Sequence, residues 1–252
     1  MLKKIYGDLI GFFWRGNINF IEGKLNLIFH SIPLASGKTE NIYEISEERF
    51  AQICKLLNEI RDDYFDKFNK KLVIHLTFDD GYKDFIKNAC PIIIKSKLEA
   101  TVFVIFSNLD KIQKSNFLNV QDILEIKKLN SIEIGAHGYY HEDHSNKSYD
   151  ELDDELLKIR SIANEHELSL CSFSLPYGKA NSKVIDSIIK HGFTNIYTSD
   201  YGYKIKKYGN ASIHQRVDIW SSDSDEVIRQ KIFNKWKLFF HFSSIKSRIF
   251  RI

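Results

Sequence analysis

Short apolar runs rich in β-branched residues alternate with segments of helical periodicity along this chain of 252 residues. Strands that alternate with helices favour a mostly parallel sheet wrapped by helices, because a parallel connection needs a long crossover. The pattern therefore predicts an α/β fold, and periodicity by itself leaves a closed barrel and an open doubly wound sheet as alternatives. The predicted strands are Leu25–His30, Leu72–Phe78, Ala100–Phe106, Ile132–His137, Leu170–Ser174 and Asn195–Thr198.

Helix starts are marked by polar residues that can cap the free N–H groups of a first turn. Ser148 and Glu151 form a capping-box pattern ahead of an apolar stripe that begins at Leu152. The other predicted N-caps are Ser46, Asn181 and Asp223. Three prolines, twelve glycines and no low-complexity tract leave little room for a flexible linker, so we expect a single domain over residues 1–252.

The net charge of +3 is small, and both signs are mixed along most of the sequence. A nucleic-acid-binding protein normally concentrates basic residues on one face, so no nucleic-acid partner is expected. The three cysteines are far apart and form no CxxC pair, which indicates buried or half-buried free thiols in a reducing compartment. Asp8 and Arg15 interrupt the first apolar stretch, which therefore resembles neither a signal peptide nor a membrane span. We expect a cytoplasmic protein.

The C-terminal segment 229–252 departs from this mixed charge, because no acidic residue follows Glu226 while lysines, arginines and aromatic residues alternate. A basic amphipathic segment of this kind suits contact with an anionic membrane surface, which would make the protein peripheral to the inner membrane. A helix that packs on the domain is the alternative.

Two adjacent carboxylates, Asp79 and Asp80, directly follow the predicted strand Leu72–Phe78. Side chains alternate along an extended backbone, so one carboxylate can bind a cation while its neighbour faces another part of the same cavity. Asp-Asp-Gly is also ordinary turn chemistry, and taken alone a turn explains these residues as well.

A histidine pair stands at the end of the predicted strand Ile132–His137: His137 is its last residue, and His141 follows after three residues. Imidazoles at this spacing can converge on one transition-metal ion, and one carboxylate added to two histidines leaves open positions for water and substrate. His144 offers a competing pair with His141, and a histidine-rich surface loop is the plain alternative. Because both polar pairs follow strand ends, the sequence favours a shared metal site.

Together these residues resemble the polysaccharide deacetylase family, carbohydrate esterases with the NodB-type fold. Thr77–Gly81 (Thr-Phe-Asp-Asp-Gly) is similar to the first motif of the family, and His137–His141 (His-Gly-Tyr-Tyr-His) is similar to the second. Ala100–Val104 resembles the strand between them, and Phe173–Gly178 (Phe-Ser-Leu-Pro-Tyr-Gly) resembles the third motif. The resemblance implies a distorted (β/α) barrel.

The resemblance also implies roles for individual residues. Asp79 would be the catalytic base, and Asp80, His137 and His141 would hold a divalent metal. Zinc is the expected ion, with cobalt, nickel, iron and manganese as alternatives. The backbone N–H of Tyr177 would stabilise the oxyanion formed when water attacks the acetyl group.

Two departures from the family pattern point to one branch of it. Ser174 stands where the third motif usually has Arg, and the only late histidine, His241, lies in an amphipathic segment rather than in the usual acid motif. Both departures resemble the poly-N-acetylglucosamine deacetylases, in which a histidine from an N-terminal strand supplies the acid.

Leu27–Ile32 is similar to that N-terminal element, so His30 is expected to be the general acid, with a structural, hydrogen-bonded histidine as the alternative. Arg216 is expected to orient Asp79 in place of the missing Arg, with a solvent-facing strand end around Arg216, Asp218 and Trp220 as the alternative. The sugar would contact Pro176, Tyr177 and Trp220, although ordinary packing explains these side chains as well.

The expected activity is metal-dependent removal of the N-acetyl group from an amino sugar in a glycan or lipid-linked glycan, in surface polysaccharide biosynthesis. A deformylase or other amide hydrolase acting on a sugar is one alternative. A catalytically inactive glycan-binding relative is another, because folds are reused for binding. The sequence leaves the sugar and the oligomeric state open.

Overall fold

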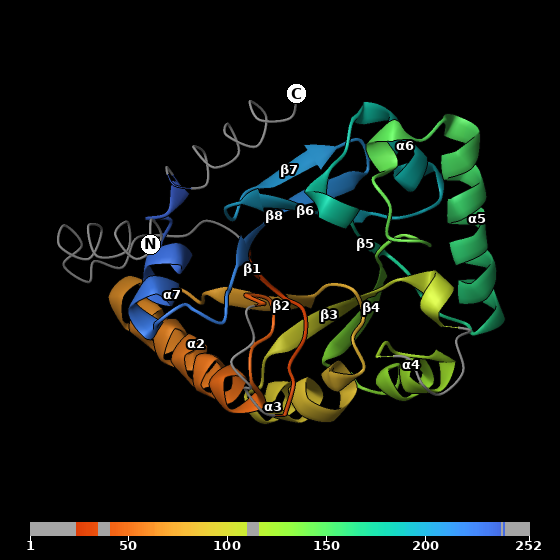
Figure 1. Ribbon diagram of the computed structural model, residues 1–252. Helices are drawn as coiled ribbons and strands as arrows, with labels where there is room; N and C mark the ends of the chain where they lie inside the picture. Colours follow the sequence, from red (N-terminus) through yellow and green to blue (C-terminus); the bar gives the residue numbers. More distant parts are fainter. Residues whose placement is uncertain (1–23, 35–40, 110–115, 238, 240–252) are drawn as a thin grey trace.

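The computed structural model describes residues 24–34, 41–109, 116–237 and 239. In this part of the chain seven parallel strands close into a barrel in the order β1-β2-β3-β4-β5-β6-β8, because β8 also pairs with β1 (Figure 1). β7 adds an antiparallel strand to β8 outside the ring. The closed ring confirms the (β/α) barrel and excludes the open sheet. The strands are β1 (Lys24–Phe29), β2 (Val73–Phe78), β3 (Glu99–Val104), β4 (Ile132–Ala136), β5 (Ser172–Ser174), β6 (Asn195–Tyr201), β7 (Ile205–Tyr208) and β8 (Ala211–Asp218).

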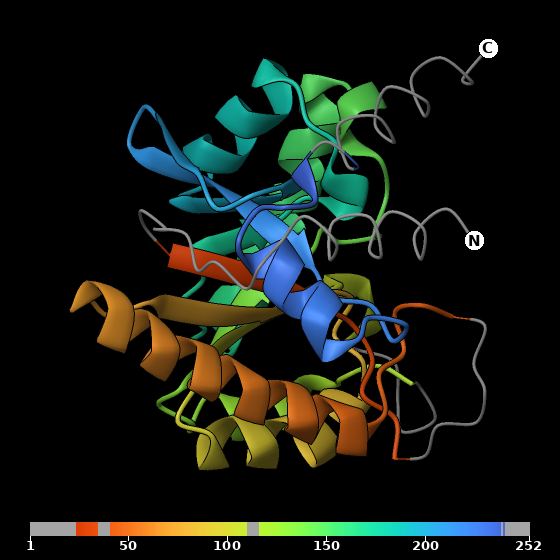
Figure 2. The same cartoon turned by 90° about the vertical axis from the view of Figure 1, so that its left-hand side faces the viewer.

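Helices surround the barrel and bury its outer face. Figures 1 and 2 show α7 beside the long helix α2, where ion pairs join Arg49 to Asp225 at 2.7 Å and Arg229 to Asp63 at 3.2 Å. The helices are α2 (Glu47–Phe68), α3 (Cys90–Lys95), α4 (Val120–Ile126), α5 (Tyr149–Glu165), α6 (Ser182–Lys190) and α7 (Asp225–Ile232). No helix among the described residues combines the length and the apolar character needed to cross a membrane.

Aromatic packing fixes the strand ends that carry the polar residues. The ring of Phe78, the last residue of β2, lies 5.3 Å from Phe29 at the end of β1, 5.7 Å from Phe50 on α2 and 4.7 Å from Phe85. All four side chains are buried. Aromatic pairs at such distances add to the free energy of burial, so the backbone entering Asp79 is held rigidly.

Three of the predicted helix caps are present, and one is wrong. The side chains of Ser46, Ser148 and Asn181 accept hydrogen bonds from backbone N–H groups of α2, α5 and α6. Ser224, not Asp223, caps α7, because the Asp223 carboxylate instead accepts hydrogen bonds from the backbone N–H of Trp220 and from the ammonium of buried Lys231.

The sequence did not predict β7 and β8. β7 is exposed except for half-buried Tyr208 and carries two lysines, and β8 has only one apolar residue in the run Ser-Ile-His-Gln-Arg. Arg216 on β8 reaches Thr77 on β2 and Ser174 on β5, which places these polar side chains inside the barrel. An interior that is polar near this end removes the apolar signal by which strands are usually recognised.

The cysteine prediction holds for two of the three thiols. Cys54 and Cys90 are buried, and burial raises the pKa of each thiol to about 12. Cys171 is exposed, because it precedes β5 at the rim of the barrel. All three are free.

Candidate functional site

A cavity of about 460 Å³ opens at the carboxyl ends of the barrel strands, within the size range of sites for small ligands. The end of β1, the loops after β2, β4 and β5, and the ends of β6 and β8 all contribute to it, as expected for a barrel of parallel strands. Its lining includes His30, Tyr43, Asp79, Asp80, His137, His141, Tyr177 and Asp218.

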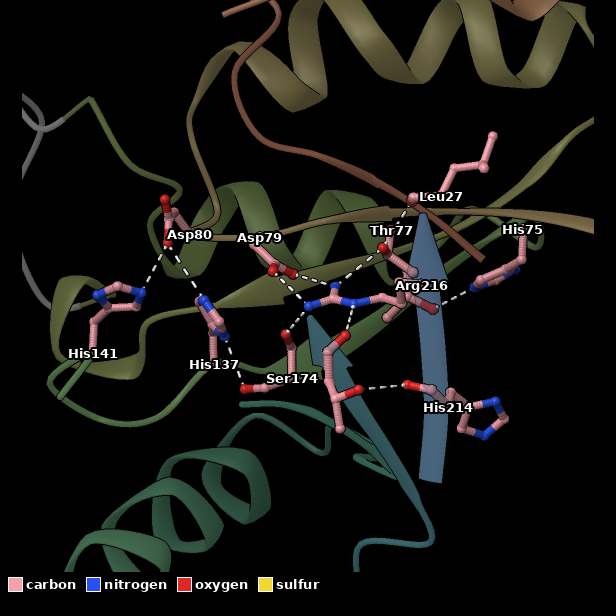
Figure 3. Close-up of polar contacts among 12 residues, drawn as sticks. Leu27, His75, Thr77, Asp79, Asp80, His137, His141, Ser174, His214 and Arg216 are labelled. Carbon is pink, nitrogen blue, oxygen red and sulfur yellow. Dashed lines mark hydrogen bonds and ion pairs between the residues drawn. The ribbon is translucent and has the colours of Figure 1, made fainter. Parts of the chain in front are cut away.

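Asp80, His137 and His141 meet in this cavity (Figure 3). Oδ1 of Asp80 lies 3.5 Å from Nε2 of His137 and 3.4 Å from Nε2 of His141. Within the described part of the chain they are the one group of three histidine, cysteine or acidic residues whose donor atoms lie close enough to share an ion.

The donor set fits a transition-metal ion. Ligands about 2.0–2.1 Å from a tetrahedral zinc ion are about 3.4 Å apart, which is the spacing that both imidazoles have from Asp80. Burial lowers the pKa of His137 to about 4, so its ring is neutral and keeps a lone pair for a metal. Nδ1–H of His137 donates a 2.8 Å hydrogen bond to the Ser174 carbonyl, which turns Nε2 toward Asp80.

Unusual backbone conformations shape the loops that carry these ligands. Asp80 has φ 70° and His141 has φ 56°, and Tyr177, which also lines the cavity, has φ 59°. Non-glycine residues rarely adopt the left-handed region, and such residues gather at functional sites, where the surrounding structure enforces them. Gly178 also lies in this region, at φ 65°. A Cβ built there would lie 2.6 Å from the Cβ of Ser199, so the position has no room for a side chain.

Arg216 holds Asp79 through a two-pronged ion pair. The terminal nitrogens Nη1 and Nη2 of the guanidinium each donate to Asp79 at 2.8 Å, and the three remaining N–H groups donate to Thr77, Ser174 and the carbonyl of Thr198. The five donors of the guanidinium are thus all used. Burial would raise the pKa of Asp79, but the guanidinium charge holds that pKa well below its usual range. Asp79 is therefore an ionised carboxylate beside Asp80.

His30 lies at the end of β1 and lines the same cavity. Its ring packs against Tyr43, with the centroids 4.6 Å apart. Burial lowers the pKa of His30, and the nearby carboxylates of Asp79 and Asp80 oppose this shift. His30, predicted from the motif Leu27–Ile32, therefore lies in the same cavity as Asp79 and Asp80, close enough for their charges to affect its pKa.

The three expected sugar contacts have different positions. Tyr177 lines the cavity and is 62% exposed, with its ring 4.8 Å from that of His141. Pro176 is buried, lies outside the lining of the cavity and begins the turn that carries Tyr177. Trp220 is wrong as a wall residue: it is buried outside the lining, and the Lys231 ammonium lies 3.4 Å from the centroid of its ring.

His144 does not join the metal ligands. Its Nε2–H donates a 3.0 Å hydrogen bond to buried Glu155 on α5, so the competing pair with His141 is excluded. Glu155 went unnoticed in the sequence, although it stands on the apolar stripe of its helix with Leu152, Leu156 and Ile159. An acidic residue on such a stripe is the signal that could have found it.

Only the start of the C-terminal segment 229–252 falls within the described residues. Lys231, Phe233 and Trp236 are buried there, so this part packs on the barrel as the alternative interpretation predicted. His241 and the other residues from 240 onward, which carry most of the expected membrane contact, lie outside the described residues.

Several residues of the cavity were not expected from the sequence. Tyr82 follows the Asp-Asp-Gly turn directly, and its position next to that motif was an available signal. Lys179 likewise follows the Pro-Tyr-Gly motif directly, whereas Tyr43 lies on a loop whose sequence carries no recognisable pattern, and its approach to the site depends on the tertiary fold.

Comparisons with known proteins agree with this geometry. The family model described as polysaccharide deacetylase matches residues 66–196, about half of the chain, including both the Asp79–Asp80 and the His137–His141 motifs. No curated protein matches the sequence significantly.

Solved structures share the fold at low sequence identity. A Streptococcus pyogenes deacetylase, PplD, solved in complex with acetate, has a TM-score of 0.71 and 20% identity, covering 84% of this chain and 99% of its own. The Bacillus cereus polysaccharide deacetylase BC0361 has a TM-score of 0.69 and 21% identity, covering 85% of this chain and 70% of its own. IcaB from Ammonifex degensii has a TM-score of 0.66 and 20% identity, covering 84% and 98%. With the match of the family model, the chain belongs to the polysaccharide deacetylase family.

Proposed function

We propose that this protein is a metal-dependent hydrolase that removes the N-acetyl group from an amino sugar of a glycan. The observation that carries the proposal is one cavity in which an ionised, arginine-bound carboxylate stands beside a two-histidine, one-carboxylate donor set. A donor set of three with open positions is typical of catalytic rather than structural metal sites.

Asp80, His137 and His141 would hold the ion, with zinc as the expected metal and cobalt, nickel, iron or manganese as alternatives. A bound divalent cation supplies Lewis-acid chemistry, which makes water acidic enough to lose a proton near neutral pH. The burial that keeps His137 neutral also excludes bulk water from one side of the donor set.

Asp79 is the residue best placed to take a proton from water. It is ionised, and each of its oxygens uses one lone pair on Arg216 and keeps another for the cavity. Arg216 also fixes the orientation of the carboxylate, which matters because a general base works only within hydrogen-bond reach of its proton. Arg216 would thus do the work of the arginine that the third motif usually has at the position of Ser174. The Ser174 hydroxyl accepts a hydrogen bond from Arg216.

His30 is the proposed general acid. An amide releases its nitrogen easily only when that nitrogen is protonated, and an imidazole is the common donor near neutral pH. His30 lines the cavity; burial lowers its pKa, and the carboxylates of Asp79 and Asp80 limit that shift by favouring the protonated ring. The backbone N–H of Tyr177, a residue on the same wall, is proposed to stabilise the oxyanion.

The intact Asp79–Arg216 pair argues against an inactive glycan-binding relative, because a pure binding protein has no need of an oriented, ionised base. We also propose a poly-N-acetylglucosamine or lipid-linked substrate and a role in surface polysaccharide synthesis, supported by the position of His30 at the end of β1. The basic residues after Glu226 support a cytoplasmic location at the membrane surface.

The test is acetate release from oligomers of N-acetylglucosamine by the zinc-loaded protein, compared with formate release from N-formyl analogues. We expect acetate from the wild type and a loss of turnover of at least about 100-fold in Asp79→Asn, as for removal of a general base. Release of formate alone would instead support the deformylase.

A further inference from the structure

The loop between the two histidine ligands is fixed from outside the cavity by one buried carboxylate. Glu155 on α5 is 3% exposed, and its Oε1 accepts a 2.6 Å hydrogen bond from the backbone N–H of Tyr139, midway between His137 and His141. A carboxylate that accepts from a backbone N–H forms a charge-assisted bond, stronger than a bond between neutral groups.

Other donors hold Glu155 itself in place. Nε2–H of His144 donates to the same Oε1 at 3.0 Å, and the Lys147 ammonium donates to Oε2 at 2.7 Å. Burial would raise the pKa of Glu155, but the bond from His144 and the other donors lower it to about 2. The carboxylate is therefore ionised and fully paired, which a buried charge requires.

Gly138 shows how closely the loop rests on this pair. Its φ is 77°, and a Cβ built there would lie 3.2 Å from Oε1 of Glu155 and 3.2 Å from Cε1 of His144. On its other side the loop is tied to the turn after β3, because N–H groups of Phe106 and Ser107 donate to the carbonyls of Gly138 and Tyr139. We call these contacts on the two sides of the loop the clamp: Glu155 supplies its side-chain half, and the backbone N–H groups of Phe106 and Ser107 supply the other half.

We propose that Glu155, held by His144, is a positioning residue for the metal site: it sets the shape of the 138–141 loop that returns His141 to His137 and Asp80. His141 itself sits in the left-handed region at φ 56°, a conformation that needs support from its surroundings. Loss of the clamp frees the loop to relax, and the His141 imidazole then spends less time within reach of the other two donors. The inference rests on the proposed metal site.

The test is the affinity of the metal-stripped protein for Zn²⁺, measured by chelator competition, together with the visible absorption spectrum of the Co²⁺ form. Glu155→Gln is expected to weaken Zn²⁺ binding about 10-fold, the lower end of the loss seen when a direct hydrogen-bond partner of a metal ligand is removed, because Glu155 acts through the loop backbone, and to alter the Co²⁺ spectrum. His144→Gln, which leaves the carboxylate in place, is expected to give a smaller loss. Asp154→Asn removes an exposed carboxylate from the neighbouring position of α5 and is the matched control, with wild-type affinity.

Three outcomes overturn the inference. Glu155→Gln with Zn²⁺ affinity within twofold of wild type and an unchanged Co²⁺ spectrum refutes the positioning role while the metal site stands. A wild-type protein that binds no Zn²⁺ refutes the metal site and the positioning role together. If Glu155→Gln does not fold by circular dichroism, hydrogen exchange of the wild type decides: the Tyr139 amide should be protected like those of β4, and exchange as fast as in an exposed loop contradicts the clamp.

Discussion

The ion pair between Arg216 and Asp79 makes a quantitative prediction about stability. Arg216 is 1% exposed and Asp79 5% exposed, and two N–H groups donate to the carboxylate at 2.8 Å. Each charge-assisted bond contributes about 1.5–3 kcal/mol, and removal of one partner of a buried pair costs about 3–5 kcal/mol. We therefore expect Arg216→Met to lower the free energy of unfolding of the metal-free protein by about 3–5 kcal/mol at pH 7.

The pH dependence of this loss has a definite sign. The folded-state pKa of Asp79 lies below its unfolded value, so the pair stabilises the fold above that unfolded value and loses its effect as the pH falls through the folded pKa. The difference in stability between wild type and Arg216→Met should thus be largest near neutral pH and shrink below about pH 4.

Urea unfolding of a double-mutant cycle measures the pair itself. Asp79→Asn with Arg216→Met should be less destabilised than the sum of the single variants, by about 1–3 kcal/mol, since neither charge is left alone. Arg160→Met is the control, because Arg160 donates to the carbonyls of Leu170 and His191 and its substitution should not couple to Asp79→Asn. Single effects that add within about 0.5 kcal/mol would refute a direct pair.

Two further predictions concern other walls of the cavity. His30→Gln should slow release of acetate from an N-acetylated sugar about 100- to 10,000-fold. It should have much less effect on an acetyl ester with an acidic leaving group, because that leaving group needs no protonation. Equal losses on both substrates would contradict the role of His30 as the acid. Burial raises the pKa of Asp218 to about 6, so its ionisation costs folded-state stability as the pH rises from about 4 through 6. Asp218→Asn should therefore stabilise the metal-free protein by roughly 1–3 kcal/mol at pH 7 and by nearly nothing at pH 4, as measured by urea unfolding, whereas a gain of equal size at both values would exclude a raised pKa as the cause.

Motifs at strand ends were the part of the site that the sequence could predict. Asp80, His137 and His141 follow apolar strands, and parallel strands bring their carboxyl ends to the same rim, so short motifs distant along the chain were enough to place them together. The barrel itself came from the resemblance, because periodicity cannot show that β8 closes onto β1.

Residues that act through tertiary contacts were harder to predict. The contact of Arg216 with Asp79 was suggested only by the absence of an arginine at Ser174, since β8 has no apolar pattern of its own. Trp220 was misplaced because an aromatic residue near a strand end is compatible with a sugar wall and with packing, and only the fold shows it against Lys231. Glu155 lies on a helix with several other acidic residues, and the sequence separates it from surface carboxylates only by its place on the apolar stripe.

The central claim is that Asp80, His137 and His141 bind one metal ion while Asp79 beside them does not. Elemental analysis after equilibrium dialysis of the stripped protein against Zn²⁺ measures this directly. One equivalent is expected for the wild type and for Asp79→Asn, and well under one for Asp80→Asn, His137→Ala and His141→Ala. Wild-type stoichiometry in these last three variants, in folded protein, would contradict the claim.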